Sequence, residues 1–272
     1  MDYEQILYEV KGRVAVITLN RPEVLNAWTP QMGQEIIDAL EKSNNNDKAG
    51  AVVITGAGRG FCSGADMRLF GQMADELQKA SDPEALMQKS REQLTGVIDL
   101  LIRKSLNSKP IIGAINGPAV GIGATMTLAW DVRLASEKAS FGFVFTRLGL
   151  VPEAGSSFLL PRIIGISKAL ELIYSGRIID AKEASEIGLV DHVLPPEKLM
   201  PTALEIAEDY AKRPSMALRL AKELIIKGAF FHGLEEALSL EREYFIRCQL
   251  SPEHREIIRA FLEKGKTSSA HA

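Results

Sequence analysis

The sequence predicts an α/β protein, in which a core of strands and helices is followed by a helical C-terminal region. Through the front half of the chain, short apolar segments rich in β-branched residues alternate with amphipathic ones, and glycine-rich turns follow several of them. Such segments are typical of buried strands joined by helices. From about residue 167 onward, helical periodicity prevails. We therefore place an α/β core at residues 1–200 and the helical region at residues 201–272.

The N-terminal part begins with a predicted β-hairpin, whose strands are residues 5–9 and 14–19. Thr29 can cap a helix, because its hydroxyl can accept a hydrogen bond from an amide two or three positions later. Pro30 suits the first position of that helix. Residues 51–55 are apolar and β-branched, so they predict a further buried strand.

Two glycine-rich turns, each directly after a buried strand, carry the strongest functional signal. One spans residues 56–67, and the other spans residues 116–123 after the predicted strand 110–115. A turn that opens a helix leaves backbone N–H groups unpaired at one spot, where they can stabilise negative charge. The lysine of a phosphate-binding loop and the glycine spacing of a dinucleotide site are both missing. An oxyanion is therefore favoured over a phosphate, and a tight packing turn is the alternative interpretation.

The segments around these turns are predicted with different degrees of detail. Asp66 lies where it can cap a short helix through Phe70. Residues 72–90 are polar and irregular, which fits either a mobile flap or a variable surface helix. Residues 94–102 predict a helix, and small apolar residues continue with helical spacing over residues 124–130.

The remaining elements follow from the same patterns. A loop over residues 148–157 leads into a helix that ends near Arg162. Short strands are predicted at residues 131–135, 139–142 and 190–194, and helices at about 167–175, 180–187, 197–212, 214–228, 233–248 and 252–264.

The composition excludes several classes of partner. The net charge is −3, from 32 basic and 35 acidic residues, so no basic excess is available for nucleic acid or an anionic membrane surface. We expect no signal peptide and no membrane span, because no apolar run has the required length. Cys62 and Cys248 are far apart and the four histidines show no ligand spacing, so we expect neither disulfides nor a metal site. These features fit a cytoplasmic protein.

Several ordered motifs together identify a family resemblance. They are Asn20-Arg21-Pro22, Leu25-Asn26-Ala27, Val53-Ile54-Thr55-Gly56, Ser63-Gly64-Ala65-Asp66-Met67, Ala114-Ile115-Asn116-Gly117, Gly149-Leu150-Val151-Pro152 and Leu160-Pro161-Arg162. With these motifs in this order, the chain resembles the enoyl-CoA hydratase/isomerase (crotonase) superfamily over almost its whole length. The resemblance implies a crotonase-like spiral of ββα units with a helical C-terminal trimerisation region, assembled as a homotrimer or a dimer of trimers.

The resemblance also implies an acyl-CoA thioester substrate, whose thioester oxygen is bound by two backbone N–H groups. Carried across to this chain, these donors are the N–H groups of Ala65 and Ile122. Many relatives have glycine at the second position, but a backbone donor tolerates the isoleucine. The implied contacts to the CoA moiety are Val24, Leu25, Ala65, Asp66, Met67 and Arg68, with Phe261 and Lys264 approaching from a neighbouring subunit. For Lys264, a solvated lysine on the last helix is the alternative interpretation.

The catalytic carboxylates distinguish the branches of this family. Hydratases use two glutamates to position and split a water, and those positions hold Thr125 and Phe145 here. Glu153 instead lies where isomerases of the family have Glu or Asp. A single carboxylate in an apolar pocket should have a raised pKa, suited to moving a proton between two carbons. The alternative is that Glu153 is an N-cap or first-turn acid of the following helix, favoured by the helix dipole.

The resemblance therefore predicts an acyl-CoA isomerase that converts 3-enoyl-CoA to 2-enoyl-CoA through a thioester enolate. No metal or redox cofactor is expected, since the substrate itself carries coenzyme A. The second hypothesis is a hydratase in which Glu153 alone manages the water, beside other reactions that begin with the same enolate. The third hypothesis is a non-catalytic protein that binds acyl-CoA.

Overall fold

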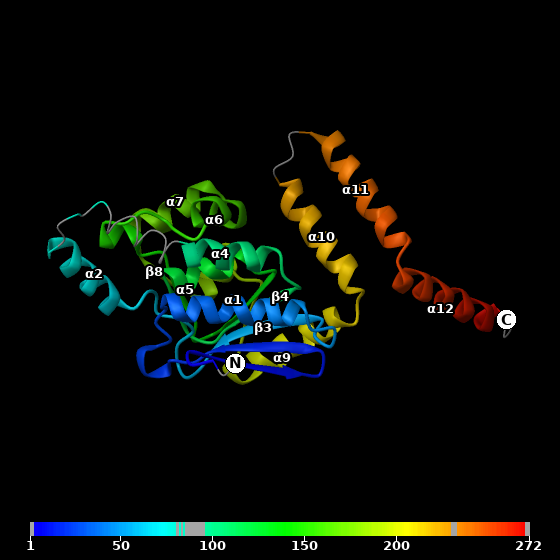
Figure 1. Ribbon diagram of the computed structural model, residues 1–272, viewed down its shortest axis with the longest axis horizontal. Coiled ribbons are helices and arrows are strands. Elements are labelled where there is room, and N and C mark those ends of the chain that lie inside the picture. The colour runs from blue at the N-terminus through cyan, green and yellow to red at the C-terminus, as the bar shows by residue number, and fades with distance from the viewer. Residues whose placement is uncertain (1–2, 80–81, 83, 85–95, 230–232, 270–272) are drawn as a thin grey trace. The chain divides into compact units, whose positions relative to one another are not determined.

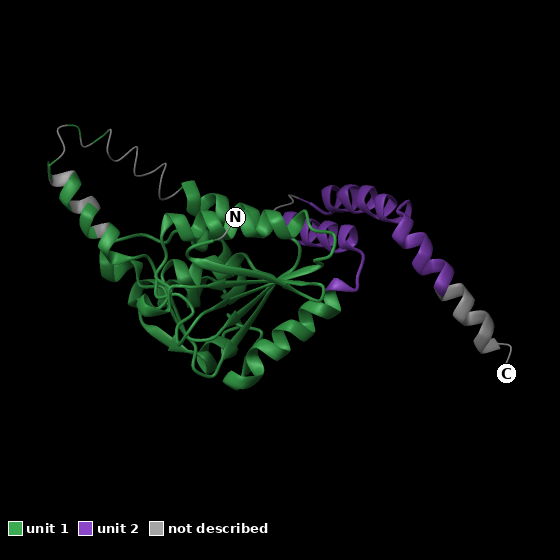
Figure 2. Ribbon diagram, turned by 60° about the horizontal axis from the view of Figure 1, so that its bottom comes forward, with its two compact units in different colours: residues 1–210 green, residues 211–272 purple. Residues whose placement is uncertain are grey.

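The chain folds into two compact units, Met1–Tyr210 and Ala211–Ala272 (Figure 2). A computed structural model describes residues 3–79, 82, 84, 96–229 and 233–269, and for residues 70, 73, 74, 77, 78 and 261–269 it describes the backbone alone. The first unit holds both β-sheets and the helices that cover them, and the second unit is helical. This arrangement confirms the predicted α/β class with helices at the C-terminus.

The larger sheet of the first unit has six strands in the order β1-β2-β3-β4-β6-β9 (Figure 1). These strands are β1 (Ile6–Lys11), β2 (Val14–Leu19), β3 (Ala51–Gly56), β4 (Ile111–Ile115), β6 (Val132–Ser136) and β9 (His192–Leu194). The pair β1/β2 is the predicted antiparallel hairpin, and the later pairs are parallel. The carboxyl ends of β3 and β4 therefore meet at one edge of the sheet, and both glycine-rich turns begin there.

A smaller sheet has three strands in the order β5-β7-β8. They are β5 (Pro118–Val120), β7 (Ser140–Gly142) and β8 (Ile178–Asp180). Strands β5 and β8 were not predicted, because each has only three residues and β5 lies inside the second glycine-rich turn. Through β5, the second glycine-rich turn belongs to this smaller sheet, whereas β4 before it belongs to the larger one.

Helices cover both faces of the six-stranded sheet. The helices of the first unit are α1 (Pro30–Asn44), α2 (Met67–Lys79), α4 (Gly96–Leu106), α5 (Ile122–Thr125), α6 (Ser156–Ile164), α7 (Ile166–Ser175), α8 (Ala181–Glu186) and α9 (Pro196–Ala211). Alternate residues of β2 and β3 separate into two buried clusters, as the side-chain period of a strand requires. One cluster packs with α1 and α4, and the other packs with α9.

Helix α1 begins and ends as its sequence predicts. The Met32 N–H donates to Thr29 Oγ1 at 3.1 Å, and Pro30 occupies the first helical position. At the other end, the buried ammonium of Lys109 donates to the carbonyl oxygens of Ser43 (3.0 Å) and Ala49 (2.7 Å). This ammonium satisfies carbonyls just beyond the reach of the helical hydrogen bonds.

Two predicted helices have different lengths in the structure. Helix α2 continues to Lys79 rather than ending at Phe70, so the polar segment 72–90 begins as a helix; residues 80–81, 83 and 85–90 lie outside the described residues. Over residues 124–130, helix α5 ends at Thr125 and a 3-10 helix follows (Met126–Ala129). Trp130 is extended (φ −96°, ψ 155°), because the chain must turn there into β6.

The boundary between the units differs from the predicted division after residue 200. Helix α9 spans that position, and its Leu199, Ala203 and Ala207 are buried against the sheet. The second unit contains α10 (Ser215–Gly228), α11 (Leu234–Gln249) and α12 (Pro252–Ser269). Among the helices that the structure describes, none is long and apolar enough to cross a membrane.

Candidate active site

The two glycine-rich turns lie against each other, backbone to backbone. The Cys62 N–H donates to Pro118 O at 3.0 Å, and the Val120 N–H donates to Cys62 O at 2.9 Å. A Cβ atom on Gly123 would overlap Cys62 O, and one on Gly64 would lie 3.1 Å from Val120 O. Glycine is required at these contacts because any side chain would separate the two backbones.

This contact brings the amides of Ala65 and Ile122 to neighbouring turns. Ile122 is the first residue of α5, and Gly121 before it has φ 53°. Ala65 follows Gly64, whose φ is 103°. Neither N–H donates a hydrogen bond to another residue in the part of the chain that the structure describes. An oxyanion is stabilised by unpaired backbone donors of this kind when two of them are aimed at one spot.

The turn at Ala65 is held from one side by the extended segment Ala27–Trp28. The Trp28 N–H donates to Gly64 O at 2.7 Å, and the Asp66 N–H donates to Trp28 O at 2.9 Å. Sequence reasoning gave Trp28 no role, because its part in this contact depends on residues far away in the chain.

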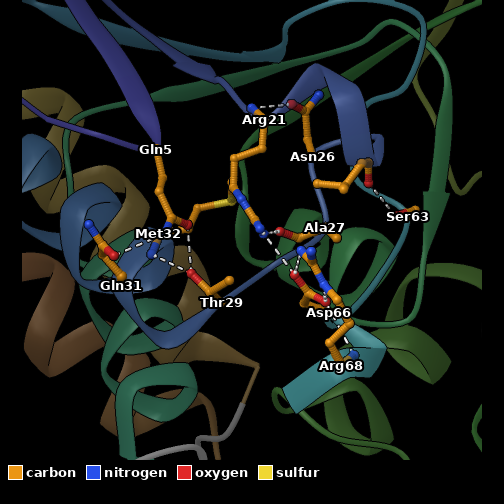
Figure 3. Close-up of polar contacts among 11 residues, drawn as sticks. Gln5, Arg21, Asn26, Ala27, Thr29, Gln31, Met32, Ser63, Asp66 and Arg68 are labelled. Atoms are coloured by element: carbon orange, nitrogen blue, oxygen red, sulfur yellow. Dashed lines mark hydrogen bonds and ion pairs between the residues drawn. The ribbon is translucent and has the colours of Figure 1, made fainter. Parts of the chain in front are cut away.

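Asp66 lies between two arginines (Figure 3). Arg68 donates to it through Nε (2.9 Å) and Nη2 (2.6 Å), and Arg21 donates through Nη2 at 3.0 Å. Hydrogen bonds from Arg68 and then from Arg21 hold the pKa of the Asp66 carboxyl well below its usual range. Asp66 is therefore ionised at neutral pH, and the Arg68 side chain remains largely exposed.

Glu153 lies in the loop between the 3-10 helix Phe145–Leu148 and helix α6. The backbone is strained directly after it, since Ala154 has φ 54°, and Gly155 follows with φ 68°, a value that glycine adopts freely. Gly155 is the N-cap residue of α6, and no side chain caps this helix. Glu153 is therefore not the cap that the alternative interpretation required, nor does it lie in the first turn.

The Glu153 carboxyl is half-buried and has no hydrogen-bond or ion-pair partner among the described residues. Burial alone raises its pKa from 4.5 to about 7. A carboxylic acid with this pKa can both take and return a proton near neutral pH.

The positions of the two hydratase glutamates are apolar or neutral here. Phe145 is buried, and Thr125 is buried with a hydroxyl Oγ1 that has no hydrogen-bond partner among the residues that the structure describes. Cys62, in the wall of the first turn, is fully buried, and burial raises the pKa of its thiol to about 12. Such a thiol stays protonated and is not a nucleophile.

Some of the residues expected to contact CoA lie near the Ala65 turn, and for others the structure describes no side chain. Val24 and Leu25 lie beside the Ala65 turn, because the Ser63 N–H donates to Leu25 O at 3.0 Å and Ser63 Oγ donates to Val24 O at 3.3 Å. Met67 is exposed at the start of α2. The side chains of Phe261 and Lys264 lie outside the described part of the structure.

A cavity of about 650 Å³ lies elsewhere, lined by Val132, Asp191, His192, Glu205, Ile206, Asp209 and Tyr210. It opens at the amino end of β6, whereas the glycine-rich turns follow the carboxyl ends of β3 and β4. It therefore does not belong to the candidate site. Across the described ranges, no cluster of His, Cys, Asp or Glu residues could hold a metal ion.

Comparison with known proteins identifies the family. A sequence model of the enoyl-CoA hydratase/isomerase family matches residues 9–270. The chain belongs to this family. It is similar to the 1,2-epoxyphenylacetyl-CoA isomerase of Escherichia coli (35% identity, 96% of each chain) and to the short-chain-enoyl-CoA hydratase of Clostridium acetobutylicum (33% identity, 98% of this chain and 97% of the relative).

The structural comparison gives the same assignment. A crystal structure of an enoyl-CoA hydratase from Bacillus anthracis superposes with a TM-score of 0.84 at 34% identity, covering 96% of this chain and 97% of the other. The protein is thus an acyl-CoA-processing enzyme of the enoyl-CoA hydratase/isomerase family with the crotonase fold. Its relatives include both isomerases and hydratases, so the choice between these reactions depends on the site.

Proposed function

We propose that this enzyme shifts a double bond in an acyl-CoA thioester, from 3-enoyl-CoA to 2-enoyl-CoA. Glu153 takes a proton from C2, which leaves a dienolate whose negative charge is shared with the thioester oxygen. Glu153 then returns the proton at C4, and the double bond moves from C3–C4 to C2–C3. The atoms balance without water, oxidant or metal.

The observation that carries the proposal is the isolation of Glu153. Its carboxyl is half-buried without a partner among the described residues, and its pKa is about 7. Hydration needs one group to activate water and another to deliver a proton, whereas an allylic shift needs a single group that does both. Thr125 and Phe145 carry no carboxylate that could serve as the second group.

The N–H groups of Ala65 and Ile122 support the same chemistry. The charge that develops on the thioester oxygen is met by two donors with no competing partner among the described residues. Each such donor contributes about 3 kcal/mol to transition-state stabilisation in a dry site.

Binding of the CoA moiety is proposed for Val24, Leu25 and the segment Ala65–Arg68, which lie together at the turn. Arg68 is the exposed cation of this group and suits a phosphate. Contacts from Phe261 and Lys264 of a neighbouring subunit, a trimer or dimer of trimers, the absence of a cofactor, and a cytoplasmic location stay predictions.

Two substrates measured in parallel test the proposal. With a 3-enoyl-CoA, we expect absorbance of the conjugated thioester to appear, and with a 2-enoyl-CoA we expect little loss of it. Rapid loss of conjugation from the 2-enoyl-CoA would instead identify a hydratase, the second candidate. The Thr125 hydroxyl, which has no partner in the described part of the chain, favours that candidate, since it offers a water one hydrogen bond in the interior. Binding of acyl-CoA without turnover of either substrate would identify a non-catalytic protein.

A further inference from the structure

A continuous chain of hydrogen bonds connects Arg21 with the backbone amide of Ala65. Arg21 Nη1 donates to Ala27 O at 2.5 Å, and Figure 3 shows the guanidinium between Ala27 and Asp66. The Ala27 carbonyl and the Trp28 N–H belong to one peptide unit. The Trp28 N–H donates to Gly64 O at 2.7 Å. The Gly64 carbonyl and the Ala65 N–H belong to a second peptide unit.

This chain fixes the direction of the Ala65 N–H. In a trans peptide the C=O and N–H groups are coplanar and point in opposite directions. The bond from Trp28 to Gly64 O therefore aims the Ala65 N–H away from Trp28. The orientation of the Trp28 peptide is in turn fixed by the bond from Arg21 to Ala27 O.

The chain also has an electrostatic consequence. A cation that donates to the first carbonyl polarises the peptide units behind it, since hydrogen bonds in series strengthen one another. Asp66 keeps the Arg21 guanidinium in place through Nη2, and both side chains are largely buried. The charge is therefore held at the start of the chain in a medium that screens it weakly.

The other proposed donor has no such connection. The carbonyl of Gly121, in the same peptide as the Ile122 N–H, accepts from the N–H groups of Ala124 and Thr125, both at 2.9 Å. These are local bonds of the helix that follows. Only the Ala65 donor depends on a side chain 44 positions away in the sequence.

We propose that Arg21 is a positioning residue, which orients and polarises the Ala65 N–H through the peptide units of Trp28 and Ala65. The proposal rests on the oxyanion role proposed for Ala65, but it does not depend on which reaction follows. It gives the arginine of the Asn20-Arg21-Pro22 motif a part in transition-state stabilisation although it touches no substrate.

The test uses the carbonyl stretch of a bound conjugated thioester, a 2,4-dienoyl-CoA, in isotope-edited vibrational difference spectra. We expect the wild-type protein to lower this frequency, the Arg21→Met variant to lose much of the shift, and Arg21→Lys to be intermediate. With a 3-enoyl-CoA, we expect kcat to fall about tenfold in Arg21→Met with KM nearly unchanged, less than the loss of a whole donor.

Arg133→Met is the matched control. Arg133 is also buried, donates to the carbonyls of Trp130 and Leu189 at 2.8 Å each, and pairs with Asp191. It should lower stability without changing the carbonyl frequency. If Arg21→Met does not fold, Arg21→Lys decides the matter through its spectrum and its kcat.

The outcomes separate this proposal from the proposed reaction. A shift that depends on Arg21 in a protein without isomerase activity would support the chain of peptides and contradict the reaction. A wild-type shift in both Arg21 variants, or no shift in the wild-type protein, would overturn the inference.

Discussion

The turn around Ala65 and the loop around Glu153 differ in how their polar groups are satisfied. In the turn, Asp66 has two arginine partners, and the surrounding backbone groups pair with the Trp28 segment. In the loop, the carboxyl of Glu153 has no partner within the described residues, and burial raises its pKa to about 7. Dense pairing makes a donor rigid, whereas the lack of pairing keeps a proton exchangeable, and a double-bond shift needs both.

The largest expected effect on kcat comes from replacing the carboxyl that exchanges a proton with the substrate. In Glu153→Gln we expect kcat with a 3-enoyl-CoA to fall by about 10³-fold, because the amide cannot take the C2 proton. The Kd of a bound acyl-CoA, measured by calorimetry, should stay close to the wild-type value.

The control for this variant is Glu137→Gln, which makes the same change at an exposed glutamate after β6. It should leave kcat unchanged. Near-normal turnover in Glu153→Gln would contradict the assignment of Glu153 as the base. The unpaired carboxyl of the Glu153 loop would then have no part in catalysis.

A smaller effect is expected when the rigid turn is disturbed. In Gly64→Ala, alanine must adopt φ 103° and its Cβ must lie 3.1 Å from Val120 O. The peptide that carries the Ala65 N–H should therefore rotate, and we expect kcat to fall by about 10²-fold, comparable to the loss of one oxyanion donor. The thioester carbonyl frequency of a bound dienoyl-CoA reports the same change.

Gly188→Ala is the matched control for that variant. Gly188 also has a positive φ, 77°, but the nearest atom to its added Cβ is 3.9 Å away. It should lower the free energy of unfolding by about 1 kcal/mol and leave kcat unchanged. Equal losses of activity in both variants would mean that backbone strain, and not the oxyanion turn, is responsible.

Local sequence patterns predicted the strands and turns that form the site, but not the contacts between residues that are distant in the sequence. The strands before both glycine-rich turns and the cap at Thr29 are visible in short stretches of sequence, whereas the role of Glu153 was predicted only from the family resemblance. The pairing of Arg21 with Asp66 is not, because it joins residues 45 positions apart that only the folded sheet brings together. Asp66 was interpreted as a helix cap and a CoA contact, and its bond to Arg21 carried no sequence signal.

The degree of burial was also beyond sequence reasoning. A raised pKa for Glu153 could be expected from a family resemblance, but its cause, desolvation without any charged neighbour, depends on the tertiary packing around the loop. In the same way, the length of α5 could not be predicted, because the turn of the chain at Trp130 toward β6 ends the helical segment.

The smallest expected effect is a dependence of stability on pH, and it measures the isolation of Glu153 directly. A carboxyl whose pKa is raised on folding from 4.5 to about 7 is protonated in the native state while the unfolded chain has lost its proton. Stability therefore falls as the pH rises from about 4.5 to about 7, and the full penalty, on the order of 3 kcal/mol, is present above that range. Glu153→Gln removes the penalty, so urea unfolding should show a more stable variant at pH 8 and nearly equal stability at about pH 4. Glu137→Gln should show no such difference. An equal gain in the free energy of unfolding at both pH values would mean that Glu153→Gln stabilises the protein through packing. The Glu153 carboxyl would then not carry the burial penalty that distinguishes it from the paired groups of the Ala65 turn.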